Sequence, residues 1–229
     1  MLTNKTKYLG FATFFLFVLC FVIDLIAAVS SFSAIDGATE SEKGTIIMLL
    51  IAEIAFDALI IVSAIVGIYK MVKSNEVEAP FRRAADCVGC FGVYIAFAEF
   101  YAIYLIDQLA KEHHTTIKIP AVVIVLIVMT ILVVILSAIA SIKKIQASFA
   151  IKVMLSIGAS LLALVVIIIL LSQGSMKPLS VVEYIFLIIT LLLNVGFAFF
   201  CLEDSKVSAA PVQKEIPESE LVDDEQKIE

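Results

Sequence analysis

Long apolar runs dominate the chain, and short polar stretches separate them. Six such runs, of 22 to 25 residues each, cover residues 8–29, 45–69, 88–109, 119–142, 149–172 and 179–202. An α-helix rises about 1.5 Å per residue, so each run is long enough to cross a hydrocarbon core of about 30 Å. Backbone polar groups inside a bilayer must be satisfied within their own segment, which favours helices. The pattern predicts an all-α polytopic membrane protein with six transmembrane helices.

The polar stretches between these runs are too short for a soluble domain. They cover residues 30–44, 70–87, 110–118, 143–148 and 173–178. Short connections make consecutive helices antiparallel neighbours, so we expect a bundle of three antiparallel hairpins. The expected organisation is a cytoplasmic N-terminus at residues 1–7, a transmembrane domain at residues 8–202 and a tail at residues 203–229.

Composition supports a membrane environment and sets the tail apart. Hydrophobic residues make up 62% of the chain, and the mean hydropathy of +1.08 exceeds what one soluble core needs. The net charge of -6 resides in the tail, where nine acids face Lys206, Lys214 and Lys227. Few apolar residues and two prolines, Pro211 and Pro217, predict a disordered acidic tail in the cytoplasm.

The distribution of basic residues predicts the orientation. One side of the membrane receives Lys5, Lys7, Lys70, Lys73, Arg82, Arg83, Lys143, Lys144 and Lys152, and the other receives Lys43, Lys111, Lys118 and Lys177. Basic residues concentrate on the cytoplasmic side, so we expect both termini in the cytoplasm. The first apolar run is longer than the core of a usual signal peptide, and we therefore expect it to remain as a helix.

Small residues spaced four apart predict places where helices approach closely. Packing within the chain is the favoured interpretation, and contact in a homo-oligomer or with other membrane proteins is the alternative. The pairs are Ser63 with Gly67, Ala98 with Ala102, Ser156 with Ser160, and Ala159 with Ala163.

Carboxylates deep inside the apolar runs are the main clue to function. Asp57 and Glu99 lie near the middle of their runs, and Glu53 is one helical turn from Asp57 on the same face. No Lys or Arg lies in the interiors of these runs to neutralise them. An ionised acid at a helix centre costs about 2.5 to 3.5 kcal/mol, so such residues face the bundle or a wet cavity.

We therefore expect Glu53, Asp57 and Glu99 to converge between the second and third segments as a candidate cation or proton site. Tyr101, Tyr104, Ser63, Asn194 and Thr130 are polar residues that could complete it. A structural network of protonated acids is the alternative.

A second set of acids is expected to be stabilised by water or lipid headgroups and not to form a functional site. Asp24, Asp107 and Glu183 lie nearer the outer ends of their segments, where water and lipid headgroups are within reach. Glu183 also follows Pro178 closely, and the positive end of a helix dipole favours an anion there.

The four cysteines, at positions 20, 87, 90 and 201, lie outside the expected outer loops, so extracellular disulfides are not expected. Cys87 and Cys90 have the spacing of a redox Cys-x-x-Cys motif, but their cytoplasmic placement without a second pair disfavours electron transfer. Reversible acylation at Cys87, Cys90 or Cys201 is the candidate modification, and packing is the alternative.

Neither a Gly-rich phosphate loop, a Ser-His-Asp arrangement nor zinc-ligand spacing occurs, so we expect no enzyme activity, cofactor, bound metal or nucleic-acid partner. The expected environment is the lipid bilayer. Two hypotheses remain: a cation- or proton-linked transporter or channel, and a non-catalytic scaffold that organises a membrane protein complex.

Overall fold

The computed structural model of the chain describes residues 2–32, 40–74, 76–112, 121–143, 148–172 and 178–209. These residues form six α-helices and contain no strand, which confirms the predicted all-helical class. The helices are α1 (Asn4–Ser31), α2 (Glu40–Lys73), α3 (Glu78–Glu112), α4 (Ala121–Ser141), α5 (Phe149–Ser172) and α6 (Pro178–Ala209). The predicted acidic tail lies outside the described residues from position 210 onward.

Several helices continue beyond the apolar runs that predicted them. α5 has the bounds of its run, but α2 begins at Glu40, α3 begins at Glu78 and α6 continues to Ala209. The expected connection at residues 70–87 is therefore mostly helical. The length of an apolar run reflects the thickness of the bilayer. A helix can continue past that run into polar residues, because its backbone hydrogen bonds do not depend on apolar side chains.

Charged side chains stabilise the polar first turns of α3. Arg82 lies 3.7 Å from the carboxylate of Glu78, and the guanidinium of Arg83 lies 3.0 Å from that of Asp86. Residues three and four apart are neighbours on a helix surface, so these pairs favour helix over loop. Pro80 is tolerated because the first turn of a helix needs no hydrogen bond from its N–H groups.

Five helices, α1, α2, α4, α5 and α6, are long and apolar enough to cross a membrane. Their outer faces carry large apolar side chains, among them Phe15, Ile51 and Met154, which are 62%, 57% and 63% exposed. Soluble proteins rarely expose apolar surface on this scale. The fold is therefore that of an integral membrane protein. Crossing by α3 and the grouping into three hairpins stay predictions.

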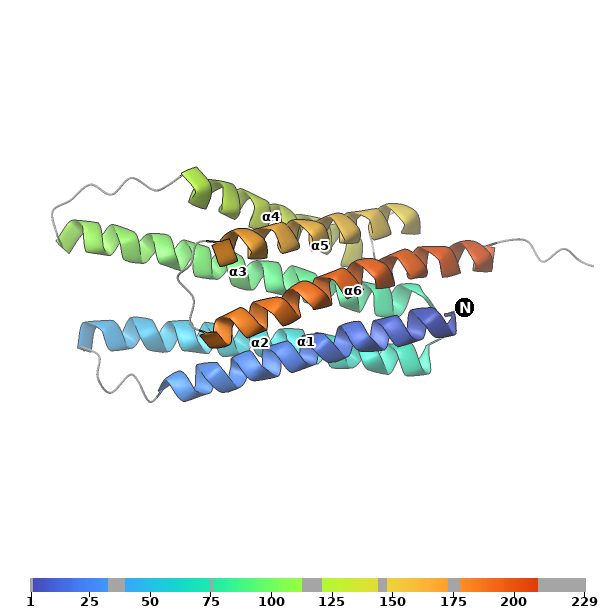
Figure 1. The fold of residues 1–229 in the computed structure, drawn as a ribbon, viewed down its shortest axis with the longest axis horizontal. Coiled ribbons are helices and arrows are strands. Elements are labelled where there is room, and N and C mark those ends of the chain that lie inside the picture. The colour runs from blue at the N-terminus through green and yellow to red at the C-terminus, as the bar shows by residue number, and fades with distance from the viewer. Residues whose placement is uncertain are drawn as a thin grey trace, which may run out of the picture.

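The helices form a closed ring. Each helix packs against the next one in the chain, and α6 packs against α1 (Figure 1). α3 also contacts α1, α5 and α6, so it touches every other helix. The backbone N–H of Thr3 donates to the carboxylate of Asp204 at 2.7 Å, which joins the start of α1 to the end of α6. Both of these helix ends lie at the same end of the bundle.

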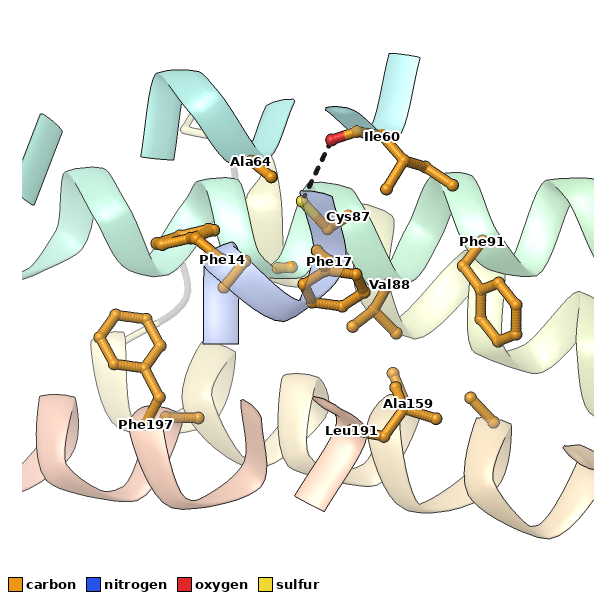
Figure 2. Packing of buried hydrophobic residues seen from close by; sticks show 14 of the residues in the cluster. Phe14, Phe17, Ile60, Ala64, Cys87, Val88, Phe91, Ala159, Leu191 and Phe197 are labelled. Carbon is orange, nitrogen blue, oxygen red and sulfur yellow. Dashed lines mark hydrogen bonds between the residues drawn. The ribbon is translucent and has the colours of Figure 1, made fainter. Parts of the chain in front are cut away.

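A packed apolar core runs through the bundle, and Figure 2 shows part of it. Phe14 and Phe17 are fully buried, and the ring of Phe14 meets that of Phe197 edge to face at 6.0 Å between centroids. Gly67 lets α2 approach the ring of Phe14. The small residues of α5 are buried inside the bundle, as packing within the chain requires: Ser156, Ala159, Ser160 and Ala163.

Gly67→Ala tests this packing. The added methyl group would overlap the ring of Phe14, which is fully buried and has no room to move. Overpacking of this kind costs about 1 to 3 kcal/mol, so we expect a lower free energy of unfolding. Circular dichroism during denaturation in detergent measures it.

Gly44→Ala is the matched control in the same helix, because no heavy atom lies within 4 Å of its added Cβ. We expect this control to be as stable as the wild type or slightly more so, since alanine favours helix. Equal stability of both variants would contradict the packing of α1 against α2.

Candidate functional site

A partly enclosed cavity of about 220 Å³ lies between α1, α2, α3 and α6. It lies in the half of the bundle remote from the start of α1 and the end of α6. Three carboxylates, two phenols and one thiol form its polar lining: Asp24, Glu53, Glu183, Tyr94, Tyr184 and Cys20. Within the described part of the chain, no Lys, Arg or His lines it. The cavity therefore gathers negative charge with no cationic side chain beside it.

Helical spacing directs these residues to one place. Asp24 follows Cys20 by four residues, so the two side chains share the face of α1 that turns into the bundle. Glu183 shares a face of α6 with the buried Leu187 in the same way. α1 and α6 are the first and last helices, and their contact in the ring brings these acids together.

Asp57 lies one turn beyond Glu53, toward the apolar core. It belongs to the buried stripe of α2, which comprises Leu50, Asp57, Ile60, Ala64, Gly67 and Met71. Asp57 is fully buried, as predicted for an acid that avoids lipid, and neither carboxylate oxygen has a hydrogen-bond partner among the described residues. It lies within electrostatic range of Asp24, Glu53 and Glu183. Asp57 is thus the innermost member of a four-acid cluster.

Glu99 does not join this cluster. It is buried, but it is not part of the cavity lining, and its Oε1 lies 3.2 Å from the hydroxyl of Thr130 on α4. Five residues at about 100° each place it about 140° around α3 from Tyr94, which faces the cavity. The structure therefore brings Glu53 and Asp57 together with Asp24 and Glu183, and it separates them from Glu99.

The contacts of Glu99 fit a structural hydrogen bond. The hydroxyl of Thr130 lies 3.2 Å from Glu99 and 2.9 Å from the carbonyl oxygen of Leu126. The Thr130 hydroxyl donates to Glu99 Oε1, while Glu99 Oε2 has no hydrogen-bond partner among the described residues. The bond to Oε1 joins α3 to α4.

Other polar residues that could have completed the site link helices instead. The amide of Asn194 on α6 donates to the hydroxyl of Ser160 on α5 at 2.9 Å. The hydroxyl of Ser63 lies 3.5 Å from the carbonyl oxygen of Arg83. Tyr104 is half-exposed, and the side chain of Tyr101 lies outside the described side chains.

The cysteines differ in how exposed their thiols are to a modifying group. All four are free thiols. Cys87 and Cys201 are fully buried, and the sulfur of Cys87 lies 3.9 Å from the carbonyl oxygen of Ile60 (Figure 2). Cys90 is partly exposed and lines a groove between α2, α3 and α4 with Asp86 and Ser137. Burial favours packing for Cys87 and Cys201, and acylation at Cys90 stays a prediction.

Sequence reasoning missed Asp24 and Glu183 as partners of Glu53. Each lies near the end of its segment, where a carboxylate has an ordinary explanation, and no sequence pattern told us that α1 and α6 are neighbours. A signal was nevertheless present, because Asp24, Glu53 and Glu183 all lie in the half of their helices farther from the two chain ends.

The chain matches no protein-family model, no curated protein and no solved structure. Function is therefore inferred from the chemistry of the cavity.

Thr130→Val tests the structural role of Glu99. Valine has nearly the shape of threonine but lacks the hydroxyl, so Glu99 would be left buried without its partner. We expect the free energy of unfolding to fall by about 1 to 3 kcal/mol. Denaturation in detergent measures the change.

The same substitution in a Glu99→Met background is the control, because no carboxyl group then needs the hydroxyl. We expect a much smaller loss there. An equal loss in both backgrounds would mean that the Thr130 hydroxyl stabilises the bundle through its contact with the carbonyl oxygen of Leu126 and not through Glu99.

Proposed function

We propose that the protein is a cation- or proton-linked membrane transporter whose site is the cavity acids Asp24, Glu53 and Glu183 together with the neighbouring buried Asp57. The observation that carries the proposal is the gathering of carboxylates from three helices around one cavity, whose described lining contains no basic side chain. Like charges in a medium of low dielectric constant repel strongly, so such a cluster takes up protons or a cation. A purely structural role would not need a cavity.

The path inward from the cavity favours a transporter over an open pore. Glu53 and Asp57 are about 6 Å apart along α2, so an ion or proton can pass from one to the other. Beyond Asp57, the fully buried Ile60, Phe17 and Phe14 close the bundle. A partly enclosed site that is closed beyond Asp57 by packed apolar side chains is compatible with alternating access.

The orientation proposed from the basic residues puts the cavity in the non-cytoplasmic half. The hydrogen bond between Thr3 and Asp204 supports an even number of crossings, because an odd number would place those residues on opposite sides of the membrane. Five helices are apolar enough to cross, so the even number is reached when α3 crosses as well. Its contacts with every other helix would shield the polar residues of α3 from lipid.

Flux measurements in liposomes test the proposal. A pH-sensitive dye inside the vesicles reports proton movement driven by gradients of Na⁺ or K⁺. We expect Glu53→Gln and Asp57→Asn to lower the flux tenfold or more, since interaction with an ionised group is worth about 1.5 to 3 kcal/mol. We also expect cation flux to fall as the pH is lowered, because protons compete for the same carboxylates.

Glu99→Gln is the matched control, since it makes the same chemical change at a buried acid outside the cavity. We expect this variant to retain its flux. A folded wild type that moves no proton or cation, with variants that unfold, would instead favour the scaffold hypothesis, in which all the buried acids hold helices together as Glu99 does.

A further inference from the structure

We infer that the cavity binds a small organic ammonium ion. The inference rests on the proposed site, and it names the class of cation that the walls of that site fit. It combines the spread of the carboxylates, the aromatic rings that line the same cavity, the volume of the cavity and the buried acid one helical turn from Glu53.

The carboxylates are spread around the cavity and do not converge on one position where a single ion could contact all of them. Asp24, Glu53 and Glu183 come from three different helices. Among the described residues, no three His, Cys, Asp or Glu side chains are close enough to hold one metal ion. A cation such as Ca²⁺ needs six to eight oxygen ligands at about 2.3 to 2.6 Å. Carboxylates spread around a cavity are better suited to a cation whose charge is distributed over several atoms.

Aromatic rings line the cavity together with these acids. Phe21, Phe91, Tyr94 and Tyr184 line the same cavity. Phe21 and Phe91 meet edge to face at 6.0 Å between ring centroids, and Figure 2 shows Phe91 within the packed cluster. The negative face of an aromatic ring attracts ammonium groups, and quaternary ammonium ligands are the ones for which proteins build aromatic walls. A lining made of acids and rings is the lining that such a ligand requires.

The cavity has the right size for this ligand. Its volume of about 220 Å³ leaves room for several water molecules or for a small organic ion. A methylated or primary amine with a few carbon atoms fills much of that space. It would displace water from the rings, which a hydrated inorganic ion would not do.

Asp57 provides the independent sign of a cationic ligand. It is fully buried one turn beyond Glu53, and neither oxygen has a hydrogen-bond partner among the residues described. It lies within electrostatic range of all three acids of the cavity. A buried carboxylate without a hydrogen-bond partner is costly unless it takes up a proton or a positive charge is close to it, and a cation in the cavity would supply that charge.

Isothermal titration calorimetry with tetramethylammonium chloride tests the inference. The full chain is purified in maltoside detergent, and an equal concentration of NaCl gives the reference titration. We expect tetramethylammonium to bind and the NaCl heats to be those of dilution. Glu53→Gln should weaken binding, whereas Glu99→Gln should not, because Glu99 lies outside the cavity lining.

Variants of Tyr184 separate the contribution of its ring from that of its hydroxyl. We expect Tyr184→Leu to weaken binding about 2- to 30-fold and Tyr184→Phe to retain it, since a phenyl ring keeps the attraction for the cation. Tyr8→Leu is the matched control, because Tyr8 is exposed and lies outside the cavity lining. Tyr94→Leu supplies the same comparison if Tyr184→Leu does not fold. Equal binding by a folded leucine variant would overturn the inference.

An ammonium group could come from a free amine or from the headgroup of a choline lipid. Displacement of tetramethylammonium by dihexanoyl phosphatidylcholine, but not by dihexanoyl phosphatidylglycerol, would assign the headgroup. Binding that neither lipid displaces would assign a free amine.

The outcomes also separate this inference from the proposed transport. Cation or proton flux without tetramethylammonium binding would overturn the inference and leave the transporter proposal standing. Binding without any flux would support the ammonium site and contradict the transporter proposal.

Discussion

Carboxylates inside a hydrocarbon layer impose the constraint on which this structure depends. Each ionised acid exposed to lipid at the middle of a helix would cost about 2.5 to 3.5 kcal/mol, and among the residues that the structure describes no basic side chain lines the cavity to offset that cost. The bundle meets the constraint by turning its polar groups inward and its apolar side chains outward. Asp57 and Glu99 are buried, whereas Phe15, Ile51 and Met154 are exposed.

The bundle handles its acids in two ways. Glu99 links two helices, because the Thr130 hydroxyl donates to it and it lies outside the lining of the cavity. The acids from α1, α2 and α6 are gathered around a cavity, and Asp57 has no hydrogen-bond partner among the described residues. Closure of the ring between α6 and α1 creates this difference, because it brings residues from opposite ends of the sequence to one place.

Much of the fold could be predicted from local pattern, because bilayer thickness and helical rise leave few alternatives. α5 has the bounds of its apolar run, and Asp57 is buried as its depth required. The neighbours of each helix could not be predicted, since apolar surfaces in lipid carry little information about partners. The sequence therefore did not predict that Asp24 and Glu183 lie beside Glu53. Glu99 was predicted to join Glu53 because both lie deep in their segments, but Glu99 contacts Thr130 on α4. The charged turn at Glu78 was read as a loop because ion pairs on its surface leave no apolar signal.

Access of water to the cavity tests the central claim most directly. In a cysteine-free background, single cysteines at Glu183→Cys and Ile185→Cys are treated with a membrane-impermeant maleimide from the non-cytoplasmic side. The two positions have nearly the same depth on α6, but Glu183 lines the cavity and Ile185 is half-exposed on the outer surface. The account predicts rapid labelling of Glu183→Cys and none of Ile185→Cys. Labelling of neither position, or equal labelling of both, would contradict it.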